Sequence, residues 1–139
     1  MQRRALLFVL AAALAVPVVH AQQADAVKSA VDAADRWLAI ADAGDGAATW
    51  DQAAASFQAA VSRSAWSDAL KQARQPFGAV KSRKLLSTEF KNSLPGAPPG
   101  EYVLIQYETQ FEQRVRAVET LVPMRERDGR WKVSGYFVK

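Results

Sequence analysis

The residues of this chain that could do chemistry are carboxylates and phenols. Its 139 residues contain no cysteine and a single histidine, His20. Proton transfer between an Asp or Glu base and a Tyr donor remains possible, provided that burial tunes their pKa values. The candidates are Asp35, Glu119 and Tyr107, with Thr109 near Tyr107 in the sequence.

Each candidate also has a structural interpretation. Glu119 alternates with Val118 and Thr120, which favours a position on the solvent face of a strand. Tyr107 has the pattern of a core residue with a satisfied hydroxyl, and Asp35 that of a residue on the polar side of a helix. We therefore predict no catalytic residue, and the alternative is an isomerase- or dehydratase-like enzyme that uses Glu119 or Asp35 with Tyr107.

Motifs for cofactors and metals do not support a further site. The seven glycines form neither a phosphate-binding loop nor a dinucleotide-binding fingerprint. The aspartates of ADAGDGAATWD lack the spacing and the closing glutamate of a calcium-binding EF-hand loop. We expect no cofactor and no metal site.

The N-terminal residues have the pattern of a secretory signal peptide. MQRR is basic, ALLFVLAAALAV (5–16) is apolar, and Val19 and Ala21 form a small-residue cleavage site. The apolar run is shorter than the about 20 residues that a membrane span needs. We expect cleavage after Ala21, which removes His20 and leaves one domain, residues 22–139. The protein would then be exported, to the periplasm or the medium, with no transmembrane anchor.

The charge balance argues against nucleic acid as a partner. The formal net charge is +4, but Arg3 and Arg4 leave with the signal peptide, and sixteen basic residues then face fourteen acidic ones. The KSRK run at 81–84 and the arginines at 125, 127 and 130 are typical of a solvated strand face. No basic stripe interleaved with aromatic residues is present.

Hydrophobic spacing predicts helices first and strands second. Apolar residues recur at three- and four-residue spacing in 24–43, and further helical pieces are expected at 47–60 and 63–75. Gly44 is expected to end the first helix, and Ser62 to cap the third. Strands are expected at 80–90, 101–112, 117–127 and 131–137, with Asp128-Gly129 as a two-residue type I′ turn.

The alternation predicts which strand residues face the helices. The expected inward residues are Val80, Ser82, Lys84, Leu86, Thr88 and Phe90, then Val103, Ile105, Tyr107, Thr109 and Phe111, then Val118, Thr120, Val122 and Met124, and finally Trp131, Val133, Gly135 and Phe137. The fold class is therefore α+β, with three helical pieces on a curved four-stranded antiparallel sheet. We interpret Gly135 as a bend that lets a large aromatic such as Trp37 lie over bare backbone.

The four tryptophans, at 37, 50, 66 and 131, are expected to hold helices and sheet together. An aromatic-lined ligand cavity would use the same kind of residue. Its expected lining is Trp37, Phe57, Trp66, Tyr107, Thr109, Trp131 and Gly135.

Several segments together resemble a known family. DRWLAIADAGD, SRSAWSDALKQARQPFGAVKSRKLLS, LPGAPPGEYVLIQY, AVETLVPM and DGRWKVSGYFVK resemble the bacterial exported proteins grouped as domain of unknown function 4019. The order of elements is also similar to the cystatin-like or nuclear-transport-factor-like cone. These resemblances imply a fold and an envelope location, and they assign no catalytic residues.

We therefore expect an exported, non-catalytic binding module, a monomer or weak homodimer. Its partner would be a small apolar ligand or an envelope protein. A third interpretation is a structural partner of an envelope complex, which would show an exposed apolar patch and no cavity.

Overall fold

The computed structural model describes residues 18–139, and residues 1–17 of the expected signal peptide lie outside this part. The elements are α1 (Val18–Asp42), α2 (Gly46–Asp51), α3 (Ala55–Ala60), α4 (Arg63–Arg74), a 3-10 turn (Gln75–Phe77), β1 (Val80–Lys91), β2 (Tyr102–Phe111), β3 (Arg114–Arg125) and β4 (Trp131–Val138). Helices precede strands, so the α+β class is confirmed.

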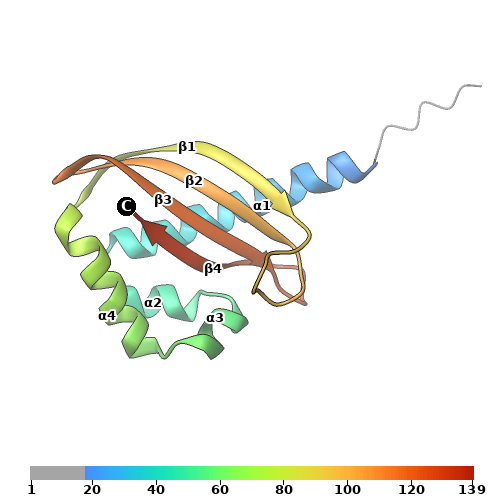
Figure 1. Ribbon diagram of the computed structural model, residues 1–139, viewed down its shortest axis with the longest axis horizontal. Helices are drawn as coiled ribbons and strands as arrows, with labels where there is room; N and C mark the ends of the chain where they lie inside the picture. The colour runs from blue at the N-terminus through green and yellow to red at the C-terminus, as the bar shows by residue number, and fades with distance from the viewer. Residues whose placement is uncertain (1–17) are drawn as a thin grey trace, which may run out of the picture.

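The four strands form one antiparallel sheet in the order β1-β2-β3-β4, with each strand beside its neighbour in sequence. Figure 1 shows α1 running across one side of the curved sheet and extending past it at its N-terminal end, with α2, α3 and α4 beside β4. On the opposite side of the sheet, Tyr102 and Met124 form a second buried cluster with Ala54, against which Phe57 of α3 packs. In residues 18–139, no helix has both the length and the apolar content that a bilayer span requires.

The helix α1 presents a stripe of small residues and two large ones to the sheet. Its buried residues are Ala30, Ala33, Ala34, Trp37, Leu38 and Ala41. Alanines let the helix backbone approach the strands closely, while Trp37 and Leu38 supply most of the buried apolar area. The helix ends as expected, because Gly44 adopts a positive φ of 82° and its N–H bonds to the carbonyl of Ala41.

The second expected helical piece is divided into α2 and α3. Ala54 is extended between them, and its N–H donates to the carbonyl of Val133 at 2.8 Å. The carboxylate of Glu126 then accepts from the N–H of Ala55 at 2.9 Å, at the start of α3. These two bonds attach the chain to β4 and its turn. The spacing of apolar residues does not predict such bonds between distant residues.

The turn between β3 and β4 differs from the expected type I′. No residue other than glycine has a positive φ in the described chain, so Asp128 cannot occupy the first position of such a turn. Instead the N–H of Gly129 bonds to the carbonyl of Glu126, and the N–H of Glu126 bonds to the carbonyl of Arg130. This is a three-residue loop with a left-handed Gly129, the next most common hairpin.

Two irregularities in β1 displace its inward face from the expected one. The register between β1 and β2 shifts between Val80 and Ser82 and again between Leu85 and Ser87. Residues paired across two strands share a face. The β1 partners of the β2 residues buried on the α1 side (Val103, Ile105, Tyr107, Thr109 and Phe111) are therefore Phe90, Thr88, Leu85, Arg83 and Val80. The expected positions of Ser82, Lys84 and Leu86 on this face are wrong.

The expected face of β3 is also wrong, because all four expected residues, Met124 included, alternate with the residues that face α1. Glu119 pairs with Tyr107 and Leu121 with Ile105, so both lie on the helix side with Ala117. Val118, Thr120 and Val122 alternate with them and are only partly buried. Their β-branched side chains suit either side of a sheet, which makes alternation ambiguous here.

A bulge in β4 accounts for Gly135. Between the pairs Leu121–Tyr136 and Pro123–Val133, β4 contains one more residue than β3. Tyr136 is consequently buried and Phe137 is 64% exposed, the reverse of the expectation. A Cβ on Gly135 would meet Phe137 at 3.5 Å and Val122 at 3.7 Å, so it lies on the outer side and Trp37 does not cover it.

Candidate functional site

The most deeply buried ionisable group is the carboxylate of Glu119 on β3. Its side chain is 0% exposed, which corrects the expected position on the solvent face. It accepts hydrogen bonds from Arg83 Nε at 2.8 Å, from the Thr109 hydroxyl at 2.5 Å and from the Tyr136 hydroxyl at 2.5 Å. A buried carboxylate is tolerated only with such partners.

Arg83 extends this cluster toward α1 and α4. Its Nη1 and Nη2 donate to the two oxygens of Asp42 at 2.8 and 3.0 Å, and Arg74 Nη2 donates to the same carboxylate at 2.6 Å. Burial opposes ionisation of Asp42, but the hydrogen bonds and charges of Arg83 and Arg74 outweigh it and lower its pKa. Burial likewise opposes the charge of Arg83, yet Asp42 and Glu119 raise its pKa.

One atom of Arg74 lacks an ordinary partner. Its Nη1 is buried with no hydrogen-bond acceptor in residues 18–139, while the guanidinium carbon lies 5.5 Å from the centre of the Phe111 ring. The cation–π contact therefore compensates part of the desolvation.

Asp35 and Tyr107, the other pair of the enzyme alternative, are also in contact. The Tyr107 hydroxyl donates to Asp35 Oδ1 at 2.6 Å and so joins β2 to α1. Burial, together with the bond to Asp35 and its charge, raises the pKa of Tyr107. Burial and the charge of Glu119 raise the pKa of Tyr136 in the same way. Both phenols are held neutral and serve as hydrogen-bond donors.

The arrangement suits structural use of these groups better than proton transfer. Three donors already occupy the oxygens of Glu119. Five grooves on the described surface, of about 290 to about 770 Å³, have linings that exclude Glu119, Thr109, Tyr107 and Tyr136. A base acting on a substrate needs hydrogen-bond reach to the proton that it abstracts.

Three of the aromatic residues expected around a cavity fill the space between helices and sheet. Trp66 lies 4.8 Å from Phe57 and 6.3 Å from Trp37, and Trp37 lies 5.0 Å from Tyr136, between ring centres. The indole N–H groups of Trp37 and Trp66 both bond to Thr49, at its carbonyl and its hydroxyl. The groove described next is lined by none of five residues expected around a cavity, namely Phe57, Trp66, Tyr107, Thr109 and Gly135.

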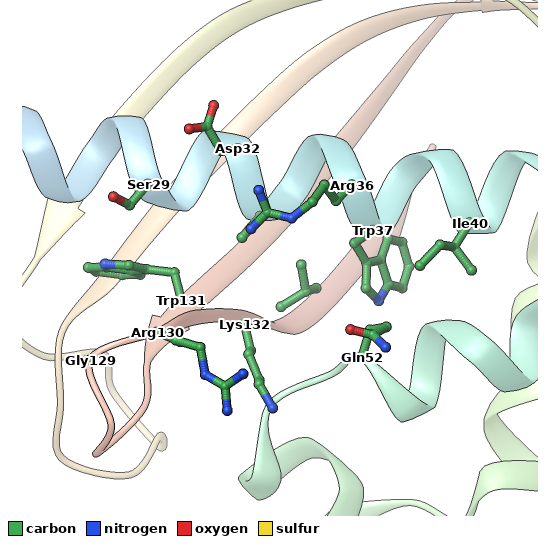
Figure 2. Close-up of a pocket in the computed structure, with 12 residues that line it drawn as sticks. Ser29, Asp32, Arg36, Trp37, Ile40, Gln52, Gly129, Arg130, Trp131 and Lys132 are labelled. Carbon is green, nitrogen blue, oxygen red and sulfur yellow. The ribbon is translucent and has the colours of Figure 1, made fainter.

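A groove of about 580 Å³ lies between α1 and β4. We call it the α1–β4 groove, and its lining is Ser29, Asp32, Ala33, Arg36, Trp37, Ile40, Gln52, Gly129, Arg130, Trp131, Lys132 and Val133. Figure 2 shows Arg36 reaching down from α1 while Arg130 and Lys132 come from the strand below, with Trp131 at one end. Of the expected lining, only Trp37 and Trp131 belong to it.

The groove has an excess of positive charge. Asp32 pairs with Lys28 at 2.9 Å, and Arg130 pairs with Asp128 at 2.8 Å. Within residues 18–139, Arg36 and Lys132 take part in no ion pair. Arg36 on α1 and Lys132 on β4 are therefore cations without an ion-pair partner at this groove, although the Lys132 side chain extends from β4 away from α1 (Figure 2).

Sequence reasoning missed these cations. Arg36 precedes Trp37, and Arg130 and Lys132 flank Trp131. A basic residue beside a tryptophan in two separate elements was the available signal. It becomes informative only once the sheet places β4 beside α1.

In residues 18–139, no three or more His, Cys, Asp or Glu side chains gather closely enough to hold a metal ion. A family model described as "Protein of unknown function (DUF4019)" matches residues 33–136, which include all of the groove lining except Ser29 and Asp32. No curated protein and no solved structure matches the chain.

Proposed function

Since the chain belongs to the DUF4019 family, whose description names no activity, we propose from its own geometry that it is a non-catalytic binding module. Its site is the α1–β4 groove, and its ligand is an amphipathic anion. We place the module in the bacterial envelope, on the strength of the signal-peptide pattern at residues 1–21.

The observation that carries this proposal is the pairing of free cations with apolar surface in one groove. Arg36 and Lys132 have no ion-pair partner there, while Trp131, Trp37 and Ile40 supply apolar contact area. Sites of this kind combine an apolar lining with a few polar groups that fix orientation. Because these cations lack ion-pair partners, we expect the ligand to carry an anionic group in addition to the apolar part expected from the sequence.

The test uses two dyes that differ by one charged group. Anilinonaphthalene sulfonate is an aromatic anion, and N-phenylnaphthylamine is the same framework without the sulfonate. We expect fluorescence titration to show tighter binding of the sulfonate, and the double variant Arg36→Gln/Lys132→Gln to lose this preference.

The matched control is Lys84→Gln/Arg116→Gln, which removes the same charge from another groove. Circular dichroism establishes that both double variants are folded. If the control weakens the sulfonate as much as the groove variant does, or if both dyes bind equally to the unaltered protein, the proposal is wrong.

A further inference from the structure

We infer that the natural occupant of the α1–β4 groove is a short extended peptide with acidic side chains, which adds to the sheet as a fifth strand beside β4. This inference rests on the proposed function and specifies its ligand. It is carried by the backbone hydrogen-bonding groups along the edge of β4.

The first half of β4 has backbone groups directed away from β3. Because β4 is an edge strand, one of its sides has no strand partner. The N–H of Glu126 bonds to the carbonyl of Arg130, so the 126–130 pair is hydrogen-bonded. Antiparallel pairs alternate, and the groups of Trp131 and Val133 therefore point outward.

The contact with Ala54 supports this assignment and shows what remains open. The outward carbonyl of Val133 accepts from the N–H of Ala54 at 2.8 Å. No backbone group of another element in the described chain bonds to the N–H or carbonyl of Trp131, or to the N–H of Val133. Two donors and one acceptor therefore remain along a strand edge that lines the groove.

The opposite wall has the length and shape that an added strand requires. Its α1 residues, Ser29, Asp32, Ala33, Arg36, Trp37 and Ile40, follow the spacing of a single helix face. From Ser29 to Ile40 this face spans about 16 Å at 1.5 Å per residue. An extended chain covers that distance in about five residues at about 3.3 Å each. The groove therefore accepts a pentapeptide segment.

The wall chemistry predicts the side chains of that segment. Successive residues of a strand point to opposite sides. One set would meet the α1 side of the groove, where Trp37, Ile40 and Val133 are apolar and Arg36 lies at the wall, and the other would meet Lys132, which alternates with Val133 along β4. The expected occupant therefore alternates apolar and acidic residues, in the manner of strand addition to an exposed sheet edge.

The experiment uses a synthetic pool of fluorescein-labelled pentapeptides that alternate Val, Leu or Phe with Asp or Glu. We expect members of the pool to bind in an anisotropy titration and to displace anilinonaphthalene sulfonate. A matched pool with Lys in place of the acids serves as the charge control and is expected to bind more weakly.

The decisive readout is backbone pairing. Methylation of the peptide nitrogens that point toward β4 should weaken the affinity of the best binder about tenfold, equivalent to about 1.4 kcal/mol. Methylation of the alternate set of nitrogens should leave the affinity nearly unchanged. Bound peptide should also slow amide hydrogen exchange at Trp131 and Val133.

The possible failures are distinguishable. If the sulfonate dye binds through Arg36 and Lys132 while no peptide displaces it, the peptide inference is wrong and the proposed function stands. The inference is equally wrong if peptides bind but methylation in either register has no effect and exchange at Trp131 does not change. If neither dye nor peptide depends on the two cations, both proposals fail.

Discussion

At the residue scale, Glu119 shows how a charge is kept inside this protein and what it achieves there. An unpaired buried carboxylate would cost several kcal/mol, and three donors from β1, β2 and β4 offset that cost. Through Arg83 the same cluster reaches Asp42 at the end of α1. It therefore fixes α1 relative to β4, the two walls of the α1–β4 groove.

Glu119→Gln is expected to destabilise the protein strongly. The amide removes the charge that pairs with Arg83 and brings an N–H₂ group to a place occupied by donors. Breaking a buried ion pair costs about 3 to 5 kcal/mol. We expect the lower end of this range, because Arg83 retains its ion pair with Asp42. Urea unfolding measures this change. Glu108→Gln, on the other side of β2, should change stability by less than about 0.5 kcal/mol; equal effects would contradict the structural role of Glu119.

The buried phenols predict a loss of stability at alkaline pH. The pKa values of Tyr107 and Tyr136 are raised above the ordinary value of 10.0 in the folded protein. A group with a raised folded pKa stabilises the fold fully below its unfolded pKa, and this contribution is lost as pH rises. The free energy of unfolding should therefore fall above about pH 10. Tyrosinate absorbance of the native protein should appear together with unfolding, and a titration near pH 10 with the fold intact would contradict this.

At the element scale, the sequence was sufficient for the type and order of the elements and insufficient for their faces. Near Gly78 the spacing of apolar residues changes from three or four positions to two, and this change separated the helices from the strands. The expected strand bounds agree with the observed ones to within a few residues. The bulges in β1 and β4 then moved Arg83 and Tyr136 inward. A bulge follows from pairing with a distant strand, so local alternation cannot locate it. The likeness to the cystatin-like or nuclear-transport-factor-like cone stays a prediction.

Gly135→Ala is expected to be tolerated, in contrast to the tight site that the sequence suggested. The added methyl would make ordinary contacts of 3.5 Å with Phe137 and 3.7 Å with Val122. Replacing a glycine without strain stabilises by about 0.4 to 1 kcal/mol, through the unfolded chain. Differential scanning calorimetry should show an unchanged or higher melting temperature.

Gly46→Ala is the matched comparison for this experiment. Its methyl would meet Ser67 Oγ at 2.8 Å and Ser67 Cα at 3.0 Å, where α2 packs on α4. Overpacking of this kind costs about 1 to 3 kcal/mol. A larger loss at Gly135 than at Gly46 would contradict the outward position of the Gly135 bulge.

At the scale of the whole molecule, the groove arises from segments that are distant in the chain. Trp37 and Trp131 were predicted as lining residues because they are large aromatics. Of their basic neighbours, Arg130 was assigned to a solvated strand face and Arg36 and Lys132 were given no role, since a single element shows only that a charge is on its polar side. Only the assembled sheet brings Arg36 of α1 and Lys132 of β4 to the same groove, with the Lys132 side chain extending away from α1 (Figure 2).

Export should remove the chain up to Ala21 without loss of stability. Val18 and Val19 are 66% and 60% exposed, and the first fully buried residue of α1 is Ala30. Mass spectrometry of protein recovered from the periplasm or the medium should give an N-terminus at Gln22. A protein that begins at Gln22 should melt at the same temperature as one that begins at Val18. Recovery of the chain only from the cytoplasm, with residues 1–21 retained, would contradict the envelope assignment.

The ion-pair chain that runs from Glu119 through Arg83 and Asp42 to Arg74 has a consequence for folding kinetics. Its contacts join residues 36, 41 and 32 positions apart. Closing such loops costs entropy before any contact forms, whereas the hairpins close locally. We expect the chain to assemble after the rate-limiting step, so that Asp42→Asn accelerates unfolding and leaves the refolding rate nearly unchanged. If the refolding arm of the chevron slows instead, these charges already hold α1 to β1 in the transition state.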